Sequence, residues 1–421
     1  MKTIASIAAE LQGYDPQALR VDAVNAFLSR LTEPVTQQEN VGIFQALGRV
    51  LAQDVISPIS VPAHDNSAMD GYAFNAAQLR SDSPLTLKIA GTLRAGAGWA
   101  LPVAPGECIK IMTGAIMPHG LDTVVPQEFV SGNDTSITIP AGILHAGDNR
   151  RLRGEDLMQG QPALRQGQLL TPAALGLLAS LGIEQLSVWR KLRVAYFSTG
   201  DEILSLGQAP REGAVYDSNR YTVFGLLSRL GCEVIDMGVV RDEPAVLEAA
   251  FTRAAQQADA IITSGGVSVG EADFTKLMMK KLGDVAFWKI AMRPGRPMAV
   301  GRIGGAVLFG LPGNPVAVMV TFLAFVRPAL LQMMGSTVGA PPMLKAHSME
   351  PLRKKPGRTE YQRGIVSTNA DGTLQVQTTG NQGSGVLSSM VQANGLIVLH
   401  HEQGNVAIGD LVDVMMFDGV I

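Results

Sequence analysis

Cysteine and histidine are scarce in this sequence. It contains two cysteines, Cys108 and Cys232, and six histidines. The chain has neither a CxxC pair nor an HxxxH pair, which are spacings typical of zinc, iron–sulfur and haem sites. Two cysteines so far apart are also too few for a disulfide scaffold. We therefore expect that the protein itself supplies no soft ligands to a metal.

A surplus of basic residues is missing as well. The chain has 34 lysines and arginines against 37 aspartates and glutamates, which leaves a formal net charge of −3. Non-specific binding of nucleic acid depends on positive charge that neutralises phosphates. We therefore expect no nucleic-acid partner.

The sequence also lacks long hydrophobic runs. The N-terminal segment has no apolar core of signal-peptide length before Glu10. The longest apolar run, from Val316 to Val326, ends at Arg327 and falls well short of the ~20 residues that span a bilayer. These features predict a cytoplasmic protein with no membrane partner.

Glycine, in contrast, is abundant, with 46 residues in a chain of 421. This is roughly 11%, against an average near 7%. Most of the excess lies in short loops between apolar segments. These loops contain most of the candidate functional residues.

The length of 421 residues predicts roughly three domains. Helical spacing of apolar residues predicts one helix that ends before Pro34 and a second over Val41 to Leu51. Short β-branched runs separated by glycine and proline follow, and they predict a small β domain over 58–149. Thr171 and Pro172 have the residue types of a helix cap and a first helical turn.

From residue 191 onward, short apolar strands alternate with helices as far as about residue 335. Such alternation predicts βαβ units around a central doubly wound, mostly parallel sheet. After Pro341 and Pro342 only short strands are expected, so the C-terminal 341–421 reads as a small β-barrel or sandwich. The predicted fold class is therefore multidomain α/β.

Four loops follow the predicted parallel strands, and we expect all four at one edge of the sheet. They read STGDE (198–202), RDEP (241–244), TSGGVSVGEAD (263–273) and LPGNP (311–315). Their glycines allow close approach of an anion to backbone N–H groups. Neither GxGxxG nor GxxxxGK[ST] is present, so no nucleotide fingerprint is claimed. Taken singly, each loop can also be an ordinary turn.

Carboxylates occur in three of these loops, among them Glu202, Asp242 and Asp273. Acids beside an anion site repel the ligand unless a hard cation bridges them, and Mg²⁺ held by one or two carboxylates and a phosphate is the usual solution. Asp242 and Asp273 can equally be N-caps of the helices that follow them.

Arg293 and Arg296 lie in a loop stiffened by proline, and arginine suits bidentate binding of an oxyanion. The alternative is a solvated loop. In LPGNP, Pro312 and Pro315 restrict the backbone, which is also what a rigid turn before a helix requires.

Outside the α/β region three further loops are rich in polar residues. They read HDNSAMDGYA (64–73), IMTGAIMP (111–118) and RRLRGED (150–156). Charge runs of the last kind are usually solvated, and nothing in the sequence suggests a Ser-His-Asp or Cys-His arrangement.

Taken together, these strings resemble the molybdopterin molybdenumtransferase family, which includes the MoeA proteins and the E domain of gephyrin. The resemblance rests on DNSAMDGYA, IMTGA, RRxGED, FSTGDE, YDSNR, RDEP, SGGVSVGEADF, LPGNPVA and QGSGVLSSMVQANGLIVL, in that order along nearly the whole chain. It implies an enzyme of molybdenum cofactor synthesis. In the implied reaction, adenylated molybdopterin and molybdate react in a Mg²⁺-dependent way to give the metal-loaded cofactor and AMP.

The resemblance also implies a homodimer with its active site in a cleft between subunits. The implied domains are an elongated domain made of 1–57 plus 150–190, the small β-rich 58–149, the central 191–335 and the C-terminal 341–421. Molybdopterin adenylyltransferase and downstream cofactor-handling proteins are the implied partners. The sequence does not separate molybdate from tungstate.

Matching positions imply site residues of three kinds. The implied catalytic residues are Asp65, Thr113, Asp156, Glu202, Asp242, Asp273, Pro312 and Pro315. Substrate-binding positions are Ser264, Gly265, Gly266, Ser268, Arg293, Arg296, Arg358 and Ser384, and the metal ligands are Asp242 and Asp273. Arg293 and Arg296 replace the lysines common in the family, and Glu243 replaces an aspartate.

Two other functions compete with this interpretation. The sister enzyme molybdopterin adenylyltransferase has a related α/β domain, but it lacks the flanking β parts and carries a GGTG-type loop. A non-catalytic scaffold is the second rival, because the E domain of gephyrin also clusters receptor tails. A scaffold has no need for several self-repelling acids at one sheet edge.

Overall fold

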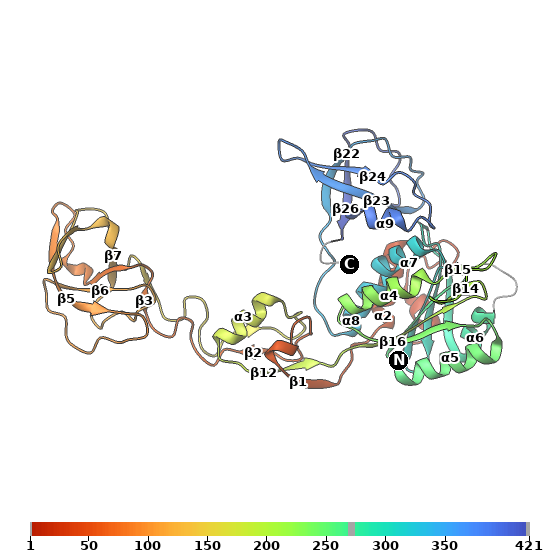
Figure 1. The fold of residues 1–421 in the computed structure, drawn as a ribbon, viewed down its shortest axis with the longest axis horizontal. Coiled ribbons are helices and arrows are strands. Elements are labelled where there is room, and N and C mark those ends of the chain that lie inside the picture. Colours follow the sequence, from red (N-terminus) through yellow and green to blue (C-terminus); the bar gives the residue numbers. More distant parts are fainter. Residues whose placement is uncertain (1, 268–273, 418–421) are drawn as a thin grey trace.

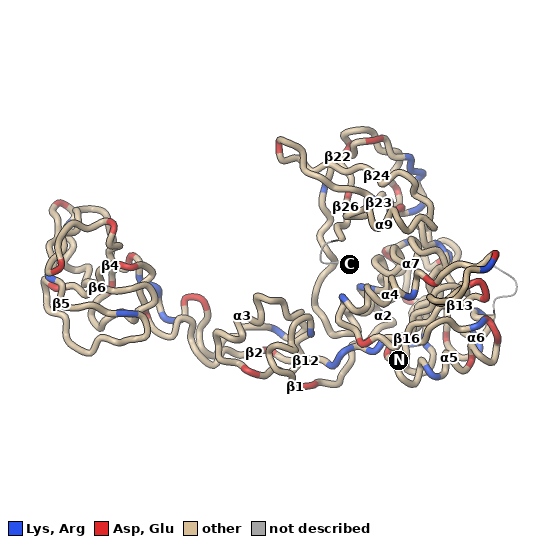
Figure 2. The backbone as a smooth tube through the Cα atoms, in the orientation of Figure 1, with Lys and Arg blue, Asp and Glu red and all other residues tan. Residues whose placement is uncertain are grey.

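The structure is a computed structural model that describes residues 2–267 and 274–417. It is elongated, with a small β region at one end and an α/β region beside a β-barrel at the other (Figure 1). Lysine and arginine positions are interspersed with aspartate and glutamate along all parts of the chain (Figure 2). The predicted multidomain α/β fold class is confirmed.

The small β region is a six-stranded sheet in the order β7-β4-β6-β5-β9-β8. Its strands are β4 (Gly71–Phe74), β5 (Leu85–Leu93), β6 (Glu107–Ile111), β7 (Thr123–Pro126), β8 (Ser131–Gly132) and β9 (Ser136–Ile139). Successive residues point to opposite faces, so Cys108 and Ile109 belong to two different apolar clusters. Both faces of this sheet are therefore covered, and both residues are fully buried.

An arm of paired strands joins this region to the rest of the protein. Going outward, β1 (Gln38–Gly42), β2 (Val55–Ile56) and β3 (Asn66–Ser67) pair antiparallel with the returning strands β12 (Gln185–Trp189), β11 (Pro162–Leu164) and β10 (Arg150–Arg151). Helix α3 (Pro172–Ser180) covers the arm, and Thr171 caps it through a bond from the Ala174 N–H. The predicted cap is confirmed.

The helix expected over Val41 to Leu51 is wrong. This segment contains the end of β1 and a short 3₁₀ turn, η1 (Ile43–Gln45). Five residues of β1 pair with β12, which follows more than 140 positions later. Long-range strand pairing overrides a local helical pattern here, and a single segment cannot reveal its partner.

The α/β region is built on a second six-stranded sheet, in the order β16-β13-β17-β21-β20-β18. The strands are β13 (Arg193–Thr199), β16 (Glu233–Val240), β17 (Ala260–Ser264), β18 (Gly283–Lys289), β20 (Pro297–Ile303) and β21 (Ala306–Leu311). The first four strands in this order are parallel, β20 runs antiparallel to its two neighbours β21 and β18, and β18 therefore runs in the same direction as the first four. The predicted mostly parallel sheet is confirmed.

Helices cover both faces of this sheet (Figure 1). They are α4 (Ser218–Arg229), α5 (Pro244–Gln257), α6 (Phe274–Leu282), α7 (Pro315–Thr321), the π-helical η4 (Phe322–Val326) and α8 (Arg327–Met333). Helices α1 (Ile4–Glu10) and α2 (Val21–Leu31) share the same apolar core as β13. Val194 lies in that core, while the next residue, Ala195, lies in the core on the opposite face.

The C-terminal region is a closed barrel of five strands. They are β22 (Leu344–Ser348), β23 (Thr359–Thr368), β24 (Leu374–Thr378), β25 (Gly395–Leu399) and β26 (Leu411–Met416). The ring runs β23-β24-β22-β26-β25 and closes because β25 also pairs with β23. Of the two expected architectures the barrel is therefore found, with one short helix, α9 (Ser388–Gln392).

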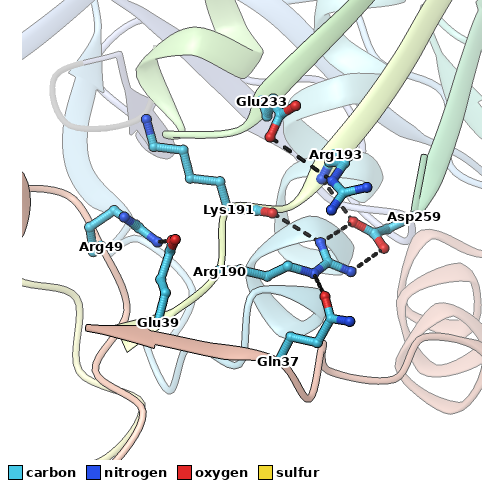
Figure 3. A network of polar contacts seen from close by, with 8 residues as sticks. All are labelled: Gln37, Glu39, Arg49, Arg190, Lys191, Arg193, Glu233 and Asp259. Carbon is cyan, nitrogen blue, oxygen red and sulfur yellow. Dashed lines mark hydrogen bonds and ion pairs between the residues drawn. The ribbon is translucent and has the colours of Figure 1, made fainter. Parts of the chain in front are cut away.

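Polar contacts hold the arm to the central sheet (Figure 3). Both terminal nitrogens of Arg190 donate to Asp259, each over 2.7 Å, and Arg190 Nε donates to Gln37. Burial opposes ionisation of Asp259, but the bonds from Arg190 and from the Arg193 N–H hold its pKa below the usual value. The two chain segments that connect the arm to the sheet, at Gln37 and at Arg190, therefore meet at the bidentate ion pair of Arg190 with Asp259.

One stretch, Pro315–Met333, is long and apolar enough to cross a membrane by length and composition. However, 78% of it is buried inside the protein, where it contributes to the core beneath the barrel. The stretch is therefore explained as a core helix.

Two neighbouring residues of α5 test which face of this helix is buried. Leu247 is 0% exposed and Val246 is 39% exposed. We expect Leu247→Ala to lower the free energy of unfolding by about 2–5 kcal/mol, because it removes buried methyl groups and leaves a cavity. Val246→Ala should change it by less than about 1 kcal/mol. Urea unfolding followed by circular dichroism measures both, and equal losses would contradict the assigned face.

Candidate active site

The four predicted loops all begin at one sheet edge, in the part of the chain that the structure describes. They follow β13, β16, β17 and β21, which are parallel neighbours. The chain leaves β13 toward β16 on one side, and β17 lies on the other side of β13. This arrangement makes the gap between β13 and β17 a topological switch point, where ligands bind in such sheets.

Buried hydroxyl groups form a cluster at this switch point. Tyr196 Oη lies 2.7 Å from Ser264 Oγ and 2.8 Å from Ser198 Oγ, and Ser198 Oγ donates to Asp217 Oδ1 over 2.9 Å. Ser264, one of the predicted substrate-binding residues, is only 3% exposed. Burial raises the pKa of the Tyr196 phenol, so it stays protonated at neutral pH.

The glycine turn after β17 has a conformation that requires its glycines. Gly265 and Gly266 have φ angles of +89° and +66°. A Cβ on Gly265 would lie 2.5 Å from the Thr199 carbonyl oxygen, and one on Gly266 would lie 2.5 Å from the Thr275 Cβ. The two predicted glycines therefore allow this turn to pack directly on β13 and α6. Ser268 and Asp273 lie outside the described residues.

Asp242 lies in the loop after β16 and contacts the start of α6. Its Oδ1 atom accepts a hydrogen bond from Thr275 Oγ1 over 3.1 Å. The N-cap of α5 is Glu243, so the alternative interpretation of Asp242 as the cap of that helix is wrong. Thr275 is fully buried, and its hydroxyl fixes one carboxylate oxygen of Asp242 at the sheet edge.

Glu202 is a second predicted carboxylate in the loops at this edge. It is exposed, and a Cβ on Gly200 would come within 2.7 Å of its Oε2 atom. No group of three or more potential metal-ligating side chains occurs among the described residues. Asp242 and Glu202 instead offer isolated hard oxygen ligands, which is the donor set that suits a cation shared with substrate phosphate.

The LPGNP loop connects the sheet edge to the barrel. Pro312 is buried, and Pro315 occupies the first turn of α7, so its interpretation as a helix-starting proline is confirmed. Asn314 Nδ2 donates to Ser384 Oγ over 2.9 Å, and the Val316 N–H donates to the Ser384 carbonyl over 3.1 Å. Ser384 of the barrel is therefore held against this loop.

Arginines of two regions meet where β19 pairs with β23. Arg293 is exposed and lies in β19 (Met292–Arg293), which pairs with β23 so that Arg293 is opposite Glu360. Arg358 Nε donates to Glu360 Oε1 over 2.7 Å, and Glu360 is 2% exposed. Arg358 is thus engaged by a buried acid, while Arg296 is exposed in the same loop as Arg293.

The structure identifies a further arginine that the sequence analysis missed, Arg363. It is 1% exposed, and its guanidinium donates to Ser389 Oγ and to the carbonyls of Asn381 and Gly383. Burial and the charge of Arg293 lower its pKa. A lone arginine among the alternating apolar residues of a predicted strand is the signal that should have identified it.

The remaining predicted residues lie on the arm and the small β region, away from the sheet edge. Asp65 accepts from the Arg153 N–H over 2.8 Å, and Asp156 is exposed. Thr113 donates its N–H and its hydroxyl to Asp70, and these bonds lower the pKa of Asp70. Figure 1 places β3, next to Asp65, far from β13 and β16 within one chain.

Comparison with known families agrees with this architecture. The chain matches the family described as MoeA N-terminal region (domain I and II) over residues 19–182. It matches the Probable molybdopterin binding domain over residues 195–332 and the MoeA C-terminal region (domain IV) over residues 345–417. Together these matches span most of the chain.

Curated relatives and solved structures cover almost the same length. A molybdopterin molybdenumtransferase of Haemophilus influenzae is 44% identical over 95% of this chain and 98% of its own. Molybdopterin molybdenumtransferase 2 of Mycobacterium tuberculosis is 36% identical over 93% of this chain and 97% of its own. A crystal structure of the molybdopterin biosynthesis MoeA protein from Pyrococcus horikoshii OT3 has a TM-score of 0.81 at 26% identity, covering 95% of this chain and all of that one.

The three matched ranges coincide with the arm and small β region, with the α/β region and with the barrel described above. The expected family is therefore confirmed by whole-length similarity as well as by motifs. The chain is a transferase of molybdenum cofactor biosynthesis and belongs to the molybdopterin molybdenumtransferase (MoeA) family.

Proposed function

We propose that this enzyme inserts molybdenum from molybdate into adenylated molybdopterin, in a Mg²⁺-dependent reaction that releases AMP. The observation that carries the proposal is the juxtaposition at one sheet edge. Carboxylates lie in the loops after β13 and β16, and arginines lie where β19 and β23 pair. A substrate with a phosphoanhydride and an incoming oxyanion needs both kinds of group.

Asp242 and Glu202 are the described residues that would hold Mg²⁺, together with the predicted ligand Asp273. A cation bound there would neutralise negative charge on the phosphoanhydride. Thr275 orients the Asp242 carboxylate through its hydroxyl. The Gly266 N–H would bind a phosphate oxygen, because the Gly265 N–H already donates to the Leu311 carbonyl over 3.2 Å.

Molybdate is a tetrahedral dianion, so it requires cationic and N–H donors. We assign its binding to Arg293, Arg296 and Ser384, and we add Arg363 to the predicted Arg358. Arg358 is partly neutralised by Glu360, whereas the described partners of the Arg363 guanidinium are neutral oxygens. None of these partners offsets the charge of Arg363, and its bond to the Gly383 carbonyl places it next to Ser384. Pro312 and Pro315 keep the connecting loop rigid.

We infer that the active enzyme is a homodimer. Within one chain, the arm and the small β region, which contain Asp65, Thr113 and Asp156, extend away from the α/β region (Figure 1). The arm of a second subunit would bring these residues to the sheet edge of that region. The proposed subunit divides into 1–57 plus 150–190, 58–149, 191–335 and 341–421, with α1 and α2 packed on the central part.

We place the enzyme in the cytoplasm, with no nucleic-acid or membrane partner. Molybdopterin adenylyltransferase would supply its adenylated substrate, and cofactor-handling proteins would accept the product. Tungstate has the same shape and charge as molybdate, so the proposed site accepts either oxyanion.

The first test of the reaction replaces Asp242. We expect Asp242→Asn to reduce Mg²⁺-dependent AMP release by about a hundredfold or more. The carboxylate that holds Mg²⁺ stabilises charge in the transition state, and such electrostatic stabilisation is worth about 3–4 kcal/mol. Glu243→Gln is the matched control, since Glu243 is the exposed neighbour that pairs with Arg241 at 3.7 Å. The assay mixes purified enzyme, adenylated molybdopterin, Mg²⁺ and molybdate, and it scores AMP and reconstitution of an apo-molybdoenzyme. Failure of the wild-type enzyme would overturn the proposed function.

A second test distinguishes the role of Arg363, which lies in β23, from that of Arg358, which directly precedes this strand. Arg363→Lys should raise the KM for molybdate by on the order of tenfold, because lysine loses the fork geometry while keeping the charge. Arg358→Lys should change it by less than about twofold, because its neighbour Glu360 keeps the local charge balanced. Steady-state kinetics with varied molybdate measures both values. A larger effect at position 358 would reverse the assignment.

A third test asks whether the arm acts on a second subunit. Asp65→Ala and Asp242→Asn chains, each inactive alone, should recover about a quarter of wild-type activity when co-expressed, because half of the dimers would be mixed and each mixed dimer holds one intact site. The control combines Asp242→Asn with Glu202→Gln, which damage the same sheet edge and should not complement. Absence of recovery in the first pair would contradict the shared site.

A further inference from the structure

The first turn of α4 contains two buried hydrogen-bond acceptors without a partner. Asp217 is 4% exposed and Asn219 is 8% exposed. Neither Asp217 Oδ2 nor Asn219 Oδ1 has a hydrogen-bond donor among the described residues. A buried acceptor that loses water and gains no donor costs free energy, so two of them in one turn of helix require an explanation.

The orientation of Asn219 is fixed by its neighbour. Its Nδ2 atom donates to the Gly313 carbonyl oxygen over 2.7 Å. A carbonyl can only accept, so the amide cannot be reversed without losing this bond. The oxygen of Asn219 is therefore held as the unpartnered atom, in contact with the LPGNP loop.

The hydroxyl cluster beside Asp217 has no proton to spare for a ligand. Tyr196, Ser198 and Ser264 carry one hydroxyl proton each. Asp217 Oδ1 accepts from Ser198 and from the Arg220 N–H, so the proton of Ser198 points to Asp217. The remaining protons, those of Tyr196 and Ser264, are used in the bonds among the three hydroxyls. Ser264 Oγ therefore offers lone pairs and no proton to a ligand.

These acceptors lie where the sheet binds ligands. Ser198 is opposite Ser264 in the parallel register, at the switch point between β13 and β17. Asn219 connects the same point to the loop after β21 through Gly313. The cluster combines a carboxylate with two neutral oxygens, so it favours a ligand that brings N–H donors and repels phosphate.

We propose that Asp217, Asn219 and Ser264 bind the pyrimidine edge of the pterin, where an exocyclic amino group lies next to a ring N–H. This inference rests on the proposed function, because it assigns one end of the adenylated molybdopterin to one side of the crevice. The adenine edge places an acceptor next to its amino group, and phosphates carry acceptors only. Of the parts of this substrate, the pterin alone presents two adjacent N–H donors.

Two fluorescent probes test the assignment, pterin and lumazine, in which an oxo group replaces the exocyclic amino group. We expect the wild-type protein to bind pterin at least about tenfold more tightly than lumazine, because lumazine places an oxygen where the site has acceptors. Asp217→Asn should reduce this preference to about twofold or less, since the amide puts a donor in place of Oδ2. Asparagine is also a good N-cap, so α4 is kept, and circular dichroism verifies the fold.

Matched controls separate recognition from general damage. Asp236→Asn is the same chemical change on the partner of Arg220, which is bonded to α4 but away from the crevice. It should leave the pterin preference unchanged. Binding of AMP with Mg²⁺ should be unchanged in Asp217→Asn, because the adenylate occupies the other side of the crevice.

Each outcome of the titrations decides the point. Equal affinity of the wild-type protein for both probes, or an unchanged preference in Asp217→Asn, overturns the inference. Loss of AMP binding with the pterin preference retained would also overturn it and assign the adenylate to these residues. A wild-type protein that prefers pterin but makes no cofactor in the reconstitution assay would instead refute the proposed function and leave the pterin subsite standing.

Discussion

The parallel pairing of β13 with β17 is the constraint on which the rest of the site depends. It sets Ser198 opposite Ser264 and makes both strands end at the same edge. The glycine turn after β17 then packs on Thr199 of β13, at a distance that no side chain on Gly265 would allow. Register and close packing together set where the loops begin at this edge.

Burial on both faces explains why function is confined to this edge. Val194 and Tyr196 of β13 point into one apolar core, and Ala195 and Phe197 point into the other. In β13 every residue after Arg193 is buried, so polar side chains are tolerated mainly at the two ends of the strand. The buried Tyr196 phenol is the exception, and its hydroxyl reaches Ser198 and Ser264.

The acidic and the basic residues of the proposed site come from different parts of the chain. Acids lie after β13 and β16, and arginines arrive through β19, which joins the barrel as a sixth strand. The contact of Asn314 with Ser384 joins the two sets. The ion pair of Arg190 with Asp259 holds the arm to the sheet (Figure 3). The arm, with Asp65 next to β3, extends away from the sheet of its own chain.

Local sequence patterns determined the helices and strands of the α/β region, because their periodicity and glycine turns depend on near neighbours. They also predicted that Asp242, Gly265, Gly266 and the LPGNP prolines follow strands, since residue type and position after a strand are visible in the chain. The strand β1 was missed because its partner β12 lies far along the sequence. The burial of Arg363 and the unpartnered oxygens of Asp217 and Asn219 were decided by tertiary structure alone, because burial and missing partners are properties of packing that no single segment contains.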